Sequence, residues 1–185
     1  LLALIGFVAM VIMLLPHITV KKQEAEDHKA PRDVIVEIHW PNNMPYDVDL
    51  WVQAPREVPV GFWNLGGTTF NLLRDDLGGE DDATNENYEI SYSRGSPPGE
   101  YVVNVHMYGP LPYGVTNPVN VVVSVKPKYG DVIQLLETTI NLTRRNQEET
   151  AYRFRLTAEG ELVPDSVSTP NRPLITVFKG FKKLP

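Results

Sequence analysis

Three pairs of aspartates, each close together along the chain, form its densest groups of metal-ligating side chains: Asp47 and Asp49, Asp75 and Asp76, and Asp81 and Asp82. Carboxylate oxygens in flexible loops are the ligands that Ca²⁺ prefers. The stretch DDLGGEDDATNE, however, lacks the phasing and the terminal glutamate of an EF-hand loop. We therefore expect these aspartates to lie in solvated acidic loops, and we expect no cofactor. The alternative is Ca²⁺ binding by Asp47, Asp49, Asp75 and Asp76.

The residues that would indicate an enzyme are not arranged in a familiar catalytic pattern. The sequence has neither a G-x-S-x-G nor an H-E-x-x-H motif. Its histidines are scattered without ligand spacing, at His17, His28, His39 and His106. We expect His39 and His106 to decorate strands rather than bind metal. The chain is predicted not to be an enzyme and to have no catalytic residues, with an enzyme of unknown class as the alternative.

Aromatic side chains offer a second kind of candidate site. Trp51 and Trp63, together with Tyr46, could form an exposed patch that stacks on sugars, because Trp and Tyr combine an apolar ring with a polar edge. Packing in the core or at a sheet edge explains the same residues as easily. Trp51 and Trp63 are thus candidate binding-surface residues, with both interpretations open.

Composition limits the scaffold that must position these groups. The chain has 185 residues, 42% of them hydrophobic and 22% charged, which suffices for one core, or for one core and a separate membrane element. A net charge of −6 without a basic cluster argues against a nucleic-acid partner. Cysteine is absent, which excludes disulfides, thiol catalysis and Cys-ligated zinc.

From Asp33 onward, apolar and polar residues alternate with the period of a β-strand. The alternation predicts strands at 33–40, 46–52, 87–93, 100–108, 119–126, 131–143, 151–157 and 173–181. The RGSPPG loop predicts a hairpin between 87–93 and 100–108. The segment from Trp63 to Asn87, rich in Gly and Asp, is expected to be largely loop.

These strands predict an all-β fold, an antiparallel β-sandwich of Ig-like or jelly-roll-like type, because no long amphipathic helix interrupts them. The predicted core contains Trp40, Leu50, Val52 and Ile90, with several of Tyr101, Val103, Val105, Val121 and Val123.

The first eighteen residues, LLALIGFVAMVIMLLPHI, contain no charged side chain. At about 1.5 Å per residue they cover most of a hydrocarbon core roughly 30 Å thick, which predicts a transmembrane helix at 1–18. A signal-peptide core and a buried soluble helix are the alternatives. Small residues at Ala3, Gly6 and Ala9 lie on one stripe where a second helix could pack. A polar tether at 19–32 would then join the span to a domain at 33–185.

Three motifs support a comparison. DVDLWVQAP, LLRDDLGG and SPPGEYVVNVHMYG resemble, in this order, motifs of an uncharacterised group of bacterial β-sandwich domains. The likeness covers about 33–157. It implies an extracytoplasmic module tethered to the inner membrane by one N-terminal helix. The opening helix would be similar to that of ExbD, TolR or MotB.

In those families two such helices stand inside a ring of five TolQ/ExbB/MotA-type subunits, and an Asp at the start of the span relays protons. The visible span has no acidic residue, so a relay Asp would have to precede Leu1. The leading hypothesis is therefore a single-pass subunit of an ion-driven inner-membrane motor, present as a homodimer, whose periplasmic sandwich transmits force or binds an unknown ligand. The alternative is a stand-alone anchored module that binds cell-wall glycan or calcium.

Overall fold

The computed structural model describes residues 32–79 and 86–181. Within these residues the chain forms eight strands and one helix. They are β1 (Asp33–His39), β2 (Val48–Gln53), β3 (Phe70–Arg74), β4 (Tyr88–Ser93), β5 (Gly99–Met107), β6 (Asn117–Lys126), β7 (Ile133–Leu142), β8 (Glu148–Leu156) and α3 (Leu174–Phe181).

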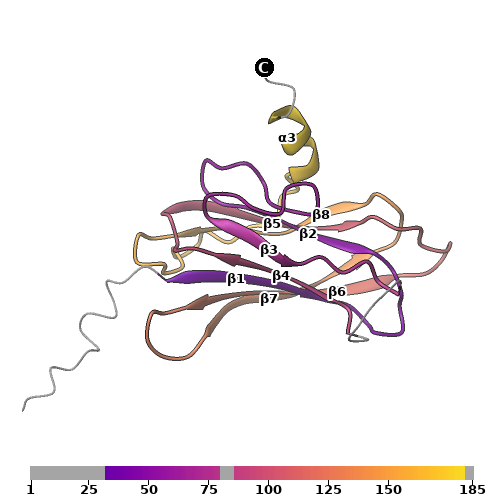
Figure 1. Cartoon of the computed structure of the whole chain (residues 1–185), viewed down its shortest axis with the longest axis horizontal. Coiled ribbons are helices and arrows are strands. Elements are labelled where there is room, and N and C mark those ends of the chain that lie inside the picture. Colours follow the sequence, from indigo (N-terminus) through magenta and orange to yellow (C-terminus); the bar gives the residue numbers. More distant parts are fainter. Residues whose placement is uncertain (1–31, 80–85, 182–185) are drawn as a thin grey trace, which may run out of the picture.

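The strands form two antiparallel sheets that pack face to face (Figure 1). The larger sheet has the order β3-β4-β1-β6-β7, and the smaller has the order β2-β5-β8. One hydrophobic core takes side chains from both sheets. The predicted all-β sandwich is therefore confirmed for the described residues.

Alternation along the strands decides which side chains enter this core. In β1, Val34, Val36 and Ile38 are fully buried, whereas Ile35 and Glu37 lie on the other face and are partly exposed. Most of the predicted core is confirmed, since the buried residues include Trp40, Leu50, Val52, Tyr101, Val103, Val105, Val121 and Val123.

The prediction that Ile90 lies in the core is wrong. Strand β4 pairs with β1 so that Glu89 lies opposite the inward-facing Ile38, and Ile90 lies opposite the outward-facing Glu37. The side chains of β4 that face the core are consequently Glu89, Ser91 and Ser93. Two of these inward-facing groups accept backbone hydrogen bonds, from Val34 N to Ser93 Oγ at 2.6 Å and from Leu50 N to Glu89 Oε2 at 2.7 Å.

The predicted hairpin between β4 and β5 is also wrong, because the two strands belong to different sheets. Their linker crosses from one sheet to the other. Asp33 Oδ1 accepts a hydrogen bond from Gly95 N at 2.7 Å, and Pro97 O accepts one from the Tyr101 hydroxyl at 2.7 Å. Pro97 and Pro98 have no backbone N–H, so this segment cannot extend a β-ladder.

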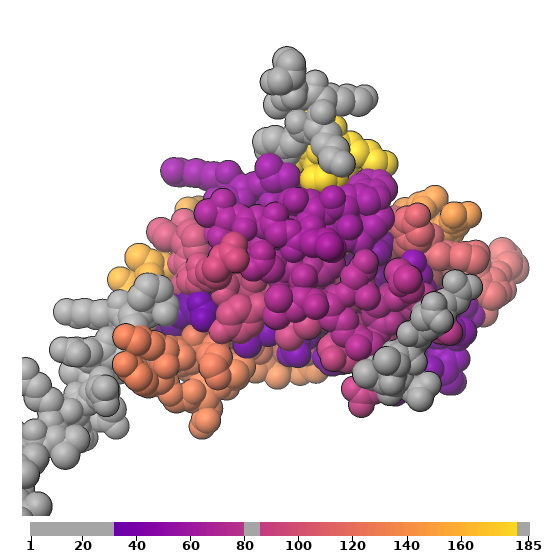
Figure 2. Space-filling view, in the orientation of Figure 1, coloured from indigo at the N-terminus to yellow at the C-terminus, as the bar shows by residue number. Residues whose placement is uncertain are grey.

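The segment predicted as a strand at 173–181 is instead the helix α3. Its apolar residues Leu174, Ile175 and Phe178 have helical spacing and pack on Trp51 and Val102, on the outer face of the smaller sheet. In the space-filling view, α3 is seated against the residues that follow β2 (Figure 2). A short amphipathic helix and a short apolar strand give similar sequence patterns, which explains the error.

In the described part of the segment from Trp63 to Asn87, the chain forms one strand, β3, at the edge of the larger sheet. The predicted span at 1–18 and most of the tether lie outside the described residues. Among the residues that are described, no helix is long and apolar enough to cross a membrane.

Candidate cation-binding site

The pairing of β2 with β5 brings the first acidic group of the site beside a histidine. Asp49 and His106 are directly opposed in the ladder, on the outer face of the smaller sheet. The Asp49 carboxylate Oδ2 lies 2.7 Å from His106 Nδ1, and both side chains are buried. Because β2 alternates, Leu50 points the other way, into the core.

A carboxylate from the larger sheet reaches the same place. Glu89 of β4 has no solvent exposure. Its Oε2 accepts a hydrogen bond from Leu50 N at 2.7 Å, and its Oε1 accepts one from Asp76 N at 3.1 Å. The side chain therefore connects the free edge of β2 to the loop after β3. Sequence reasoning missed Glu89, although a glutamate within the alternating NYEISYS segment was a signal available to it.

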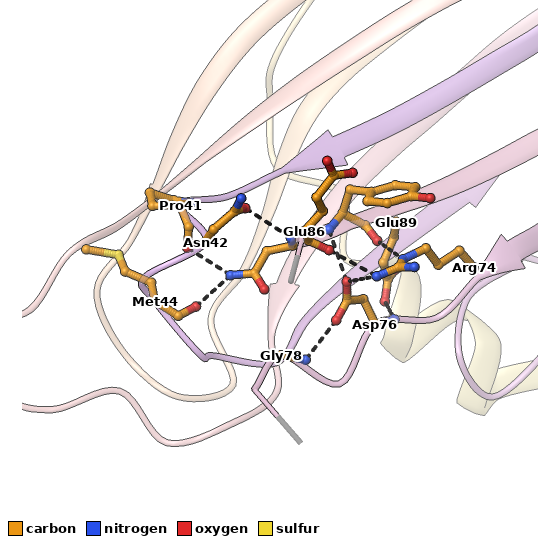
Figure 3. A network of polar contacts seen from close by, with 10 residues as sticks. Pro41, Asn42, Met44, Arg74, Asp76, Gly78, Glu86 and Glu89 are labelled. Atoms are coloured by element: carbon orange, nitrogen blue, oxygen red, sulfur yellow. Dashed lines mark hydrogen bonds and ion pairs between the residues drawn. The ribbon is translucent and has the colours of Figure 1, made fainter. Parts of the chain in front are cut away.

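The loop after β3 places two aspartates in different roles. Asp76 accepts hydrogen bonds from Gly78 N at 3.0 Å and from Tyr88 N at 3.1 Å, and it pairs with the Arg74 guanidinium at 2.8 Å (Figure 3). These contacts make Asp76 the residue that fixes the loop. Its neighbour Asp75 is exposed, and one of its carboxylate oxygens lies within 4.8 Å of carboxylate oxygens of Asp49 and Glu89.

The loop before β4 is held in the same network. Asn87 Nδ2 donates to Pro41 O at 2.8 Å and to Met44 O at 2.9 Å, while Asn42 Oδ1 accepts from Asn87 N at 3.2 Å (Figure 3). The start of β4, and with it Glu89, is thereby fixed to the loop between β1 and β2 that leads to Asp49.

Together these elements form the acidic cluster, which we define as Asp49, Asp75 and Glu89. One carboxylate oxygen from each lies within 4.8 Å of the others. Of the four predicted ligands, the structure thus brings Asp49 and Asp75 together, assigns Asp76 to loop support, and leaves Asp47 beside the cluster. Asp47 Oδ1 is buried without a hydrogen-bond partner among the described residues.

Burial and mutual repulsion act on the protonation of these groups. Burial, followed by the charges of Asp49 and Asp75, raises the pKa of Asp47 to about 7. Burial also raises the pKa of Asp49, against the hydrogen bond from His106. For Glu89, burial and then the Asp49 charge raise the pKa well above its usual range. The contact with His106 lowers the pKa of Asp47 and of Asp49 but does not offset the effect of burial on either group.

Such a cluster has two ways to relieve its repulsion. The carboxyls can retain protons, as the raised pKa values indicate, or they can bind a cation that supplies the missing positive charge. Three oxygen donors of unequal exposure, two of them buried and one reachable from solvent, suit a hard cation entering from the Asp75 side.

The two candidate tryptophans have different positions. Trp51 is fully buried, so the idea that it forms part of an exposed patch is wrong: its ring lies beneath Phe62 and Phe178, with ring centroids 5.7 Å away in each case. A side chain at Gly61 would collide with the same ring. Trp63 is 41% exposed and remains a candidate surface residue. The helix-packing candidates Ala3, Gly6 and Ala9 lie outside the described residues.

Fold and site together define an antiparallel β-sandwich domain with a partly buried acidic cluster at the edge of β2. Comparisons with family models, with curated proteins and with solved structures return no match for this chain.

Proposed function

We propose that this chain is a non-enzymatic binding module whose β-sandwich holds Ca²⁺ at the acidic cluster, with Asp47 alongside. The observation that carries the proposal is the approach of Asp49, Asp75 and Glu89 to within 4.8 Å of one another. A buried glutamate directed toward two aspartates is unfavourable when all three are ionised. A divalent cation reverses that balance, because it converts repulsion between ligands into attraction to a common centre.

The donor set favours Ca²⁺ over other metals. All donors are carboxylate oxygens, which suit hard cations, whereas zinc prefers nitrogen and sulfur. The Nδ1 of His106 is already bonded to Asp49, and the chain has no cysteine. Ca²⁺ accepts irregular arrangements of about 6–8 oxygens, so Asp47 and water could complete a shell around it. Mg²⁺ requires a near-ideal octahedron.

Calorimetric titration of Ca²⁺ into the chelator-treated full chain tests this proposal. We expect one binding site per chain, with Mg²⁺ binding at least tenfold more weakly. The variant Asp75→Asn should lose the site, since it removes the solvent-side ligand. The matched control Asp131→Asn changes an exposed aspartate of the β6–β7 turn and should bind as the wild type does. Equal binding by Asp75→Asn and wild type would contradict the assignment.

A second candidate function rests on the sequence. We propose that the apolar run at 1–18 anchors the sandwich outside the bacterial inner membrane, as the single-span subunit of an ExbD/TolR/MotB-like motor. Two copies would then stand within a pentameric channel. Purification in mild detergent tests this: a multi-span partner should co-isolate in excess over this chain, and a stable monomer would contradict it.

A further inference from the structure

A hollow of about 540 Å³ lies where four separate segments meet on the outer side of the smaller sheet. The loop after β2 supplies Phe62 and Trp63, the end of β5 supplies His106, and the residue after Met107 supplies Tyr108. The β7–β8 turn supplies Arg145, and α3 supplies Lys179. This volume suits a small ligand or one or two rings of a longer one.

Basic side chains dominate the charge of the hollow, although the whole chain has a net charge of −6. Arg145 and Lys179 are exposed, and neither forms an ion pair within the described part of the chain. Glu148 is the acidic lining residue, but its Oε1 already accepts hydrogen bonds from Asn104 Nδ2 at 2.7 Å and from Leu174 N at 2.6 Å. The Glu148 carboxylate is thus hydrogen-bonded at the start of α3. The positive charges of Arg145 and Lys179 therefore favour an anion in the hollow.

The aromatic wall of the hollow is fixed in place before any ligand arrives. The Phe62 and Trp63 ring centroids are 4.6 Å apart, and the Phe62 and Tyr108 centroids are 5.2 Å apart. Lys179 Nζ lies 4.8 Å from the Trp63 ring centroid, which ties α3 to the wall. Trp63 and Tyr108 nevertheless remain 41% and 43% exposed, so ring surface is available.

Tyr108 and Arg145 also line a second hollow, of about 760 Å³, on whose wall lies Asp47. The two hollows therefore share a boundary, and a ligand that passes Tyr108 can occupy both. This continuity favours an oligomeric ligand over a single small anion.

We propose that the hollow binds an acidic oligosaccharide, with a sugar carboxylate held by Arg145 and Lys179 and the C–H face of a sugar ring against Tyr108. Saccharides combine many hydroxyl groups with an apolar ring face, which matches a lining that is both polar and aromatic. The Nδ1 of His106 is engaged by Asp49, so its Nε2 is the ring nitrogen left for a sugar hydroxyl. This inference extends beyond the cation site and touches it through the Asp49–His106 pair and through Asp47 on the wall of the second hollow.

The test is calorimetric titration of the detergent-solubilised full chain with a hyaluronan tetrasaccharide, which carries two glucuronates, against the neutral tetramer of N-acetylglucosamine. Both titrations are run with Ca²⁺ and with EDTA. We expect saturable binding of the acidic sugar, binding of the neutral one at least tenfold weaker, and at least tenfold loss in Arg145→Ala and in Lys179→Ala. Lys128→Ala, which changes a lysine that does not line the hollow, should bind as wild type does.

Circular dichroism spectra of all variants establish that they are folded. Binding of the acidic sugar in EDTA, or only in Ca²⁺, supports the proposal, and the second result adds coupling to the cation site. No saturable binding in either buffer, equal binding of both sugars, or equal loss in Lys128→Ala would overturn it. Ca²⁺ binding without sugar binding overturns this inference while leaving the cation site intact.

Discussion

The Oδ2 of Asp49 lies 2.7 Å from Nδ1 of His106, and the two residues occupy directly opposed positions on β2 and β5. The pair fixes one carboxylate at the edge where Glu89 and Asp75 arrive from the other sheet. Asp49 thus belongs to the proposed cation site, while its partner His106 lines the basic hollow.

Stability without metal should fall as pH rises. The pKa of Asp47 is raised to about 7, and those of Asp49 and Glu89 are also raised, so the folded chain binds more protons than the unfolded one above about pH 4. The stabilisation by these protons is complete below the unfolded pKa and is lost as pH rises through the folded pKa. Urea unfolding in EDTA at steps from pH 5 to pH 8 measures this. A free energy of unfolding that rises across this range would contradict the prediction.

Replacing Glu89 by Gln should remove the repulsion and the metal response together. The amide keeps the shape and a carbonyl oxygen for one backbone N–H, but it carries no charge. We expect Glu89→Gln to weaken Ca²⁺ binding at least tenfold and to have a flatter dependence of stability on pH in EDTA. Glu159→Gln, at an exposed position, is the matched control. A variant with unchanged Ca²⁺ affinity would exclude Glu89 from the site.

Asp76 should matter for stability, because it holds the loop rather than the ion. Asp76→Ala removes the acceptor for the N–H groups of Gly78 and Tyr88 and removes the ion pair between Asp76 and Arg74. The loss of one charge-assisted bond of this kind costs up to about 1–3 kcal/mol. Because the costs of neighbouring bonds do not simply add, we expect the free energy of unfolding to fall by about 2–4 kcal/mol in urea unfolding. Asp131→Ala should change stability by less than about 0.5 kcal/mol. Equal stability of the two variants would contradict this role.

Phe178 should hold α3 on the sandwich. Phe178→Ala removes the ring that packs on Trp51 and on Trp63, at 5.7 and 6.2 Å between centroids. Water should then reach Trp51, and the tryptophan emission should shift to longer wavelength while the β-sheet signal in circular dichroism is kept. Thr176→Ala, on the exposed side of the helix, should leave the emission unchanged. An unshifted spectrum of Phe178→Ala would mean that the loop alone covers Trp51.

The sandwich itself was predictable, because alternation in segments such as DVIVEIHW directly reports one buried and one exposed face. Which side chains of β4 face the core was not predictable. Ile90 is more apolar than Glu89, and only the register with β1 shows which of the two faces inward. Sheet membership was equally hidden: β4 and β5 follow each other through a short loop, and the crossing between sheets depends on contacts that the loop makes with Asp33 and Tyr101.

The site was predictable in part. The aspartates at 47, 49, 75 and 76 were recognisable as a group, but neither their division of roles nor the third ligand could be derived from spacing. Asp76 forms an ion pair with Arg74 instead of joining the acidic cluster, and that ion pair depends on β3 lying beside β4. Glu89 completes the cluster only because the two sheets pack face to face.

Ca²⁺ binding at the acidic cluster is tested most directly by thermal unfolding of the full chain at pH 7.5, in saturating Ca²⁺ and in EDTA, for wild type and for Glu89→Gln. At a free Ca²⁺ concentration of about 100 times Kd, binding stabilises the folded state by about 2.7 kcal/mol, which raises the Tm of a domain of this size by roughly 5–10 °C. We expect this rise in wild type and its absence in Glu89→Gln. A wild-type Tm that is the same in Ca²⁺ and in EDTA would contradict it.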